Sequence, residues 1–143
     1  MRIPRSTLRL IGMASFAVVL VTTLVDCGDP KSQPTPIALV FNQSVYPLPG
    51  SLAIGSTAAI EVTISNDNQN AGVNLTCAPA GGCGTFTPAS TGSDVPACYQ
   101  TPATVPTGGS VTIIATSVTD PTKSLSSPAI TILTTDPVSG CTP

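Results

Sequence analysis

Five cysteines carry most of the chemistry that this 143-residue chain can offer: Cys27, Cys77, Cys83, Cys98 and Cys141. An even number of cysteines in an oxidising compartment is typical of disulfides, and the last four allow three pairings. Cys77 and Cys83 are six residues apart with Pro and Gly between them, so a short loop closes easily. Cys98 and Cys141 are then the remaining pair. Zinc is the alternative, but the spacing contains no Cys-x-x-Cys pair.

The absence of histidine and tryptophan excludes several other chemistries. Without His there is no Ser-His-Asp or Cys-His relay and no imidazole ligand for a metal. Acid–base catalysis would depend on scattered carboxylates, which we expect to lie in exposed turns. The sequence therefore predicts a protein without catalytic activity and without a cofactor.

One carboxylate has neighbours that could bind calcium. Asp67 lies among three amides: Asn66, Asn68 and Asn70. A calcium loop usually concentrates several carboxylates at alternating positions and includes a Gly, whereas this segment has one carboxylate. We therefore interpret it as a polar turn between two strands. A glycan site would need exposed aromatic rings, but Phe41, Tyr46, Phe86 and Tyr99 are needed to fill the core. For Tyr99 we expect a packed ring whose hydroxyl is bonded to the backbone.

The charge distribution excludes nucleic acid as a partner. All three arginines precede residue 10. After Cys27 the chain has two lysines and six acidic residues, so the net charge there is 2 − 6 = −4. Nucleic-acid binding requires basic side chains that neutralise phosphates.

Residues 1–27 have the pattern of an export signal, with a basic start followed by an apolar run over 10–25. The run of about 16 residues is at the low edge for crossing a bilayer, and a retained membrane anchor is the alternative. Leu24-Val25-Asp26-Cys27 resembles the lipobox of bacterial lipoproteins, in which the cysteine is lipidated and becomes the new N-terminus. The family pattern has Gly, Ala or Ser where this chain has Asp26. Cleavage after Cys27, which would release a soluble protein, is the competing interpretation.

The rest of the chain predicts a single all-β domain. Residues 28–36 form a Pro-rich tether, 37–134 the domain and 135–143 a C-terminal tail. The clearest strand is 58–65, in which Ile60, Val62 and Ile64 alternate with Glu61, Thr63 and Ser65. Such alternation indicates one buried face and one wet face. Other strands are expected within 37–46, 73–77, 95–99, 111–116 and 129–133. In 111–116, Val111, Ile113 and Ala115 alternate with Thr112, Ile114 and Thr116. About seven short strands separated by turns predict an antiparallel sandwich.

Three phrases resemble the bacterial immunoglobulin-like (Big-type) modules of exported proteins: TCAPAGGCGTF (76–86), YQTPATVP (99–106) and VTIIATSVTDPTKS (111–124). The resemblance extends over about residues 36–134. It implies an Ig-like sandwich, a local disulfide in the first phrase and a strand–turn–strand hairpin in the last. Leu75 stands where these modules often have a core Trp, which implies looser packing there.

The resemblance also implies a role. It predicts a non-catalytic module at the bacterial cell envelope, structural or adhesive. The lipobox-like residues 24–27 add a lipid on Cys27 that would hold the module at the membrane. A protein or glycan at the cell surface would be its partner. The alternative is a soluble secreted module that binds a glycan or calcium.

Overall fold

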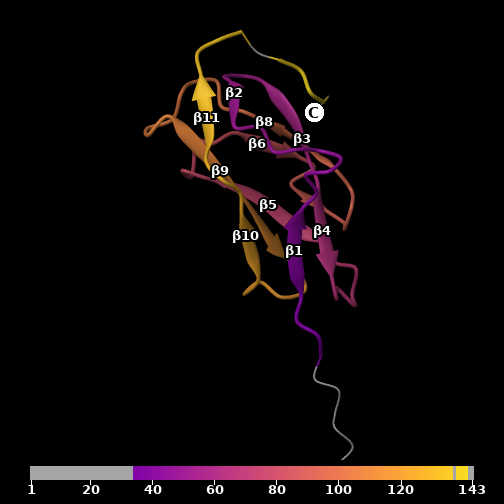
Figure 1. Cartoon of the computed structure of the whole chain (residues 1–143). Helices are drawn as coiled ribbons and strands as arrows, with labels where there is room; N and C mark the ends of the chain where they lie inside the picture. The colour runs from indigo at the N-terminus through magenta and orange to yellow at the C-terminus, as the bar shows by residue number, and fades with distance from the viewer. Residues whose placement is uncertain (1–33, 137, 142–143) are drawn as a thin grey trace, which may run out of the picture. The chain divides into compact units, whose positions relative to one another are not determined.

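The structure is a computed structural model that describes residues 34–136 and 138–141 (Figure 1). Cys27, the predicted signal segment and most of the predicted tether therefore lie outside the described residues. Within the described ranges the secondary structure is entirely β, which confirms the predicted fold class. These ranges contain no helix long and apolar enough to cross a membrane.

The described residues form eleven strands. They are β1 (Ala38–Phe41), β2 (Ser51–Ala53), β3 (Thr57–Ile60), β4 (Val62–Ser65), β5 (Val73–Ala78), β6 (Thr85–Thr87), β7 (Ser90–Thr91), β8 (Ala97–Gln100), β9 (Ser110–Ser117), β10 (Ser124–Ser126) and β11 (Ile130–Leu133).

The strand number exceeds the expected seven because four longer stretches are interrupted. Prolines separate β1 from β2, β6 from β7 and β10 from β11, at Pro47, Pro88 and Pro128 among others. Proline cannot donate to a ladder of backbone hydrogen bonds, so pairing stops there. The fourth break falls at Glu61, between β3 and β4. Seven stretches therefore account for the eleven strands.

The stretches are ordered as in an immunoglobulin-like sandwich. One layer contains β1 paired with β4, and β3, which precedes β4 directly, paired with β8 and then β6. The other layer has the order β2-β11-β9-β5-β7, with β10 also paired to β9 (Figure 1). Numbered along the chain, the stretches run first, second, fifth, fourth in one layer and seventh, sixth, third in the other. The first and fourth stretches also cross to the second layer, where β2 and β7 lie at its two edges. The β2–β11 pair is parallel, which is an exception to the antiparallel arrangement that we predicted.

The core lies between these layers. Ile60 and Tyr99 contribute from β3 and β8, and Val73, Leu75 and Ile113 contribute from β5 and β9. The predicted alternation in β9 is confirmed, because Val111, Ile113 and Ala115 are all buried. The predicted hairpin is also present, with β10 antiparallel to β9.

Glu61 is the clearest departure from the predicted pattern. Ile60, Val62 and Ile64 are buried as expected, but Glu61 is only 7% exposed instead of facing solvent. The turn after β1 covers it: the Asn42 amide donates to the Glu61 carboxylate, and the Asn42 N–H donates to its carbonyl at 2.9 Å. The pairing partner also changes at Glu61. Before it, β3 pairs with β8; after it, β4 pairs with β1.

Candidate functional site

The described cysteines form two disulfides, and these are the pairs expected from the sequence. Cys77 in β5 is bonded to Cys83, with Cα atoms 5.7 Å apart. Cys98 in β8 is bonded to Cys141, with Cα atoms 5.8 Å apart. All four cysteines of the described ranges are therefore engaged, and none of them is a thiolate that could hold zinc.

The Cys77–Cys83 disulfide lies beside a buried tyrosine. The Tyr99 hydroxyl donates a hydrogen bond to the Cys83 carbonyl, as expected for a packed ring bonded to backbone. Burial raises the pKa of Tyr99 to about 12, so the hydroxyl keeps its proton at neutral pH. Phe86 packs against the Tyr99 ring with their centroids 4.9 Å apart. This cluster ties the loop before β6 to the centre of β8.

Gly84 makes that close approach feasible. Its φ is 105°, a conformation that side-chain-bearing residues rarely adopt. A Cβ atom here would overlap the Gln100 carbonyl oxygen and lie 2.9 Å from the Tyr99 ring. The loop can therefore reach β8 only with glycine at this position.

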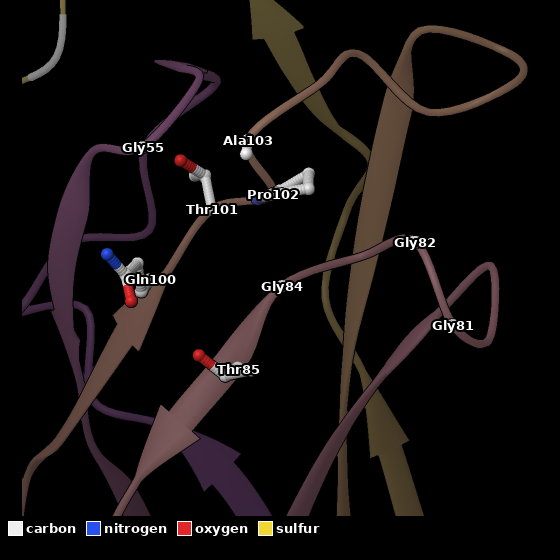
Figure 2. A pocket seen from close by; sticks show the side chains of 9 residues that line it. All are labelled: Gly55, Gly81, Gly82, Gly84, Thr85, Gln100, Thr101, Pro102 and Ala103. Atoms are coloured by element: carbon white, nitrogen blue, oxygen red, sulfur yellow. The ribbon is translucent and has the colours of Figure 1, made fainter.

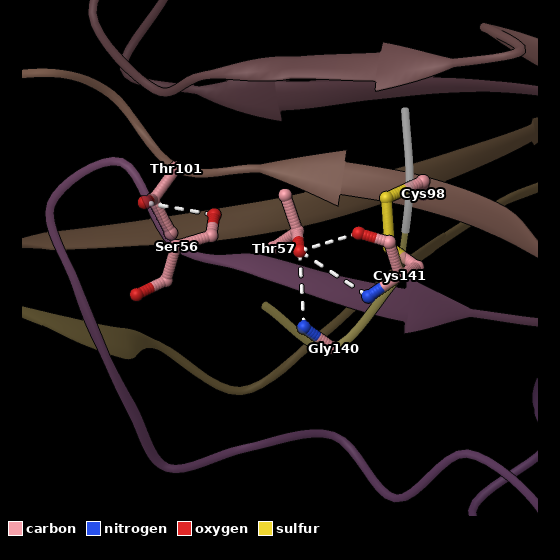
Figure 3. The surroundings of a disulfide bond; sticks show 6 residues. All are labelled: Ser56, Thr57, Cys98, Thr101, Gly140 and Cys141. Carbon is pink, nitrogen blue, oxygen red and sulfur yellow. Dashed lines mark hydrogen bonds between the residues drawn. A yellow bond between two sulfur atoms is a disulfide. The ribbon is translucent and has the colours of Figure 1, made fainter. Parts of the chain in front are cut away.

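The Cys98–Cys141 disulfide holds the C-terminal segment Val138–Cys141, which we name the strap. The strap lies alongside β3, where Thr57 is hydrogen-bonded to Gly140 and Cys141 (Figure 3). Ser56 Oγ accepts a further hydrogen bond from the Val138 N–H. Sequence reasoning expected the disulfide but treated residues 135–143 as a simple tail. The local pattern gave no signal for the contact, because Thr57 and Cys141 are 84 positions apart.

The segment around Asp67 is a turn that satisfies its own polar groups. The Thr119 hydroxyl donates to Asp67 Oδ1 at 2.6 Å, and the Gly72 N–H donates to Oδ2 at 2.9 Å. These hydrogen bonds, that from Thr119 first, hold the pKa of Asp67 below its usual value. The Asn66 amide donates to the Pro36 carbonyl. Oδ2 thus closes the turn itself, as the turn interpretation expects, and Oδ1 connects it to the β9–β10 loop.

Two further aspartates are used locally. The hydroxyls of Thr63 and Ser93 donate to Asp94, and the Thr122 hydroxyl and N–H donate to Asp120. These bonds lower the pKa of each carboxyl. The residues that the structure describes contain no group of three or more His, Cys, Asp or Glu side chains placed to bind a metal.

The loop that contains Asp94 also covers a sheet edge. Ser93 Oγ accepts from the Ile64 N–H at 2.9 Å, and the Asp94 N–H donates to the Val62 carbonyl at 3.0 Å. Because β1 occupies the other edge of β4, both edges of this strand have hydrogen-bonding neighbours.

The surface has shallow hollows whose linings offer little chemistry. One of them, of about 520 Å³, lies at the ends of β6 and β8. Its lining is dominated by glycines and small residues (Figure 2): Gly55, Gly81, Gly82, Gly84, Thr85, Gln100, Thr101, Pro102 and Ala103. A second, of about 460 Å³, borders the Cys77–Cys83 disulfide, Leu75 and Phe86. A third, of about 350 Å³, lies beside the strap and includes Tyr46. Each lining contains at most one aromatic ring and no charged side chain.

Many of the polar side chains and cysteines described above fix the backbone. Two disulfides, a buried tyrosine and hydrogen-bonded aspartates connect loops to strands. No protein family model matches this chain, and neither a curated protein nor a solved structure does.

Proposed function

We propose that this chain is an exported, non-catalytic Ig-like module that is tethered to the bacterial cell envelope through a lipid on Cys27. The observation that carries the proposal is the pair of disulfides that engages all four described cysteines. Disulfides form and persist in oxidising compartments, so they support export. The basic and apolar pattern of residues 1–27 supports it independently.

The proposed role is structural or adhesive, with a protein or glycan at the cell surface as the partner. A Pro-rich segment such as 28–36 adopts an extended conformation and would hold the domain about 28 Å from the lipid. The domain itself is cross-linked by two disulfides, and hydrogen bonds fix its loops. This role is proposed from the fold and the expected location by analogy, and not from an identified site.

Intact mass spectrometry of membrane and soluble fractions from the native host tests the tether. We expect a membrane-bound species that begins at Cys27, carries acyl mass and lacks four hydrogens because of the two disulfides. The matched control is Cys27→Ser, which should lose the acyl mass and leave the membrane fraction. A soluble wild-type species that begins after Cys27 would contradict the lipid tether, and a species that retains residues 1–27 would contradict signal cleavage.

The adhesive role is tested with cells that carry matched variants. Cells with the wild-type chain should attach to a surface or to neighbouring cells better than cells with Cys27→Ser, which release a folded domain. Equal attachment by both strains, with the domain detected on the surface of only one, would refute adhesion by a tethered module.

A further inference from the structure

The strap is attached to the domain through few residues. Val138 is 67% exposed, and the core cluster contains none of the strap residues. Residues 134–136, which precede the strap, are exposed as well. Within the described part of the chain, the hydrogen bonds of the strap end on Ser56 and Thr57. Its covalent attachment to the sheet is the Cys98–Cys141 bond.

Thr57 carries most of these hydrogen bonds (Figure 3). Its N–H donates to the Val138 carbonyl at 2.9 Å, and its carbonyl accepts from the Gly140 N–H at 3.0 Å. Its hydroxyl donates to the Cys141 carbonyl at 2.8 Å. On the other edge of β3, Thr57 pairs with Gln100 of β8. The strap can therefore leave β3 without breaking the pairing of β3 with β8.

The hydrogen bonds alone hold the strap weakly. Fixing the backbone of one residue costs about as much free energy as one or two hydrogen bonds return. For so short a segment the two effects nearly balance. Water also replaces the strap as hydrogen-bonding partner once this edge of β3 is uncovered. The disulfide therefore decides whether the strap is bound.

The Cys77–Cys83 bond has a different setting. Cys77 lies in β5, where it pairs with Ile113 of β9, and the Cys83 carbonyl accepts from the buried Tyr99 hydroxyl. Both cysteines therefore stay in place when their bond is opened, and their sulfurs remain within reach of each other. Such a pair has a high effective concentration and re-forms its bond readily. Cys141 is held by no strand, so its effective concentration falls once the strap leaves.

The Cys98–Cys141 bond can be reached from the surface. Both cysteines line the hollow of about 350 Å³ beside the strap. Cys98 is buried, whereas Cys141 is half-buried. The lining contains no charged side chain, so no charge there repels an incoming thiolate.

We infer that the Cys98–Cys141 bond is a redox-operated latch: a dithiol reductant opens it, the strap leaves β3, and the core stays packed. One thiolate of the reductant attacks the Cys141 sulfur, forms a mixed disulfide and releases the Cys98 thiolate. The second thiolate of the reductant then attacks its own sulfur in that mixed disulfide and releases the Cys141 thiolate. Two electrons pass from the dithiol, which becomes a disulfide, to the two cysteines, which take up its two protons. Reoxidation closes the latch, so the redox state decides whether this edge of β3 is covered.

The order in which the two bonds open tests the latch. Wild-type protein is equilibrated with dithiothreitol at graded reduced-to-oxidised ratios, free thiols are alkylated, and peptides are mapped. We expect Cys98 and Cys141 to be alkylated at a ratio at least about tenfold lower than Cys77 and Cys83 require. Simultaneous opening of both bonds, or earlier opening of Cys77–Cys83, would overturn the proposal.

Hydrogen exchange measured by NMR tests what opening does. With Cys98→Ser and Cys141→Ser together, the Thr57 and Gly140 amides should exchange at least about tenfold faster than in wild type. The Thr101 N–H, which donates to the Ser56 carbonyl at 2.9 Å, is the internal control and should stay slow. The matched variant carries Cys77→Ser and Cys83→Ser and should keep the strap amides slow.

Two results of the exchange experiment would overturn the latch. Unchanged exchange at Thr57 and Gly140 would show that the strap stays bound without its disulfide. Equal acceleration at Thr101 and throughout β9 would show that the domain unfolds instead of releasing the strap. Wild type at the dithiothreitol ratio that opens Cys98–Cys141 alone repeats the measurement without a substitution.

Discussion

Tyr99 shows how one side chain connects distant parts of this fold. It lies in β8, next to Cys98, and its hydroxyl donates to the carbonyl of Cys83, which is itself bonded to Cys77 in β5. A polar hydroxyl in a core is stable only when it has a partner, and the Cys83 carbonyl provides it. The tyrosine thus links the two layers through one ring and one hydrogen bond.

Replacing Tyr99 with Phe should lower the free energy of unfolding by about 1–3 kcal/mol, because a buried carbonyl is left without its donor. Tyr46→Phe is the matched control: Tyr46 is half-buried and should cost less than about 0.5 kcal/mol. Urea titration of both variants measures the difference. Equal effects from the two substitutions would show that the Tyr99 hydroxyl is not stabilising.

The same hydroxyl predicts a loss of stability at alkaline pH. A tyrosine in the unfolded chain ionises near pH 10, whereas burial raises the pKa of Tyr99 to about 12. The folded state therefore holds this proton more tightly: its stabilising effect is complete below pH 10 and is lost as pH rises through about 12. Urea titrations between pH 8 and 12 should show a steeper decline for wild type than for Tyr99→Phe. Parallel declines would contradict the assignment.

Strand β9 sets the register of its sheet. It is the longest strand, pairs with β5 along six positions, and alternates buried with half-buried residues over its whole length. A strand with one buried face resists slipping, because a shift by one residue would move every apolar side chain to the wrong side.

Two adjacent isoleucines in β9 test that register. Ile113→Ala removes a fully buried side chain and should lower the free energy of unfolding by about 2–5 kcal/mol. Ile114→Ala, on the half-buried face, should cost clearly less. Chemical denaturation of the two variants gives the comparison, and a reversed order of the losses would refute the register.

Elements with strong local patterns were predictable from sequence, and long-range contacts were not. Alternation identified β9 and the burial of Ile60 and Val62, and short spacing identified the Cys77–Cys83 pair. Glu61 was assigned to the wet face because its cover, Asn42, comes from another element. The partner change between β3 and β4 and the strap on Thr57 also depend on contacts between distant segments, which a local pattern does not encode.

At the scale of the whole molecule, the disulfides compensate for a small core. A domain of about 100 residues buries a smaller fraction of its surface than a larger one, so covalent links contribute much of its stability. The two links close loops of very different length, six residues for Cys77–Cys83 and 43 for Cys98–Cys141. Longer loops restrict the unfolded chain more.

Removing the disulfides one at a time should show that difference. Cys98→Ser with Cys141→Ser should lower the free energy of unfolding by up to about 4 kcal/mol, and Cys77→Ser with Cys83→Ser by up to about 2.4 kcal/mol. Thermal and urea unfolding of both double variants, each with the other bond intact, provides the measurement. A larger loss from the short loop would show that local packing, rather than chain entropy, determines the effect.

The Cys98–Cys141 bond also governs how the molecule responds to a pull. Tension applied at the C-terminus passes from Cys141 through sulfur to Cys98 and so reaches β8 without loading the backbone between them. That stretch stays closed even when the rest of the domain is drawn out. Spanning 43 positions, it represents about 140–155 Å of extended chain. In a single-molecule stretching experiment, the wild-type domain should lengthen by that much less than the variant with Cys98→Ser and Cys141→Ser, so this one bond sets how far the domain can be drawn out under load.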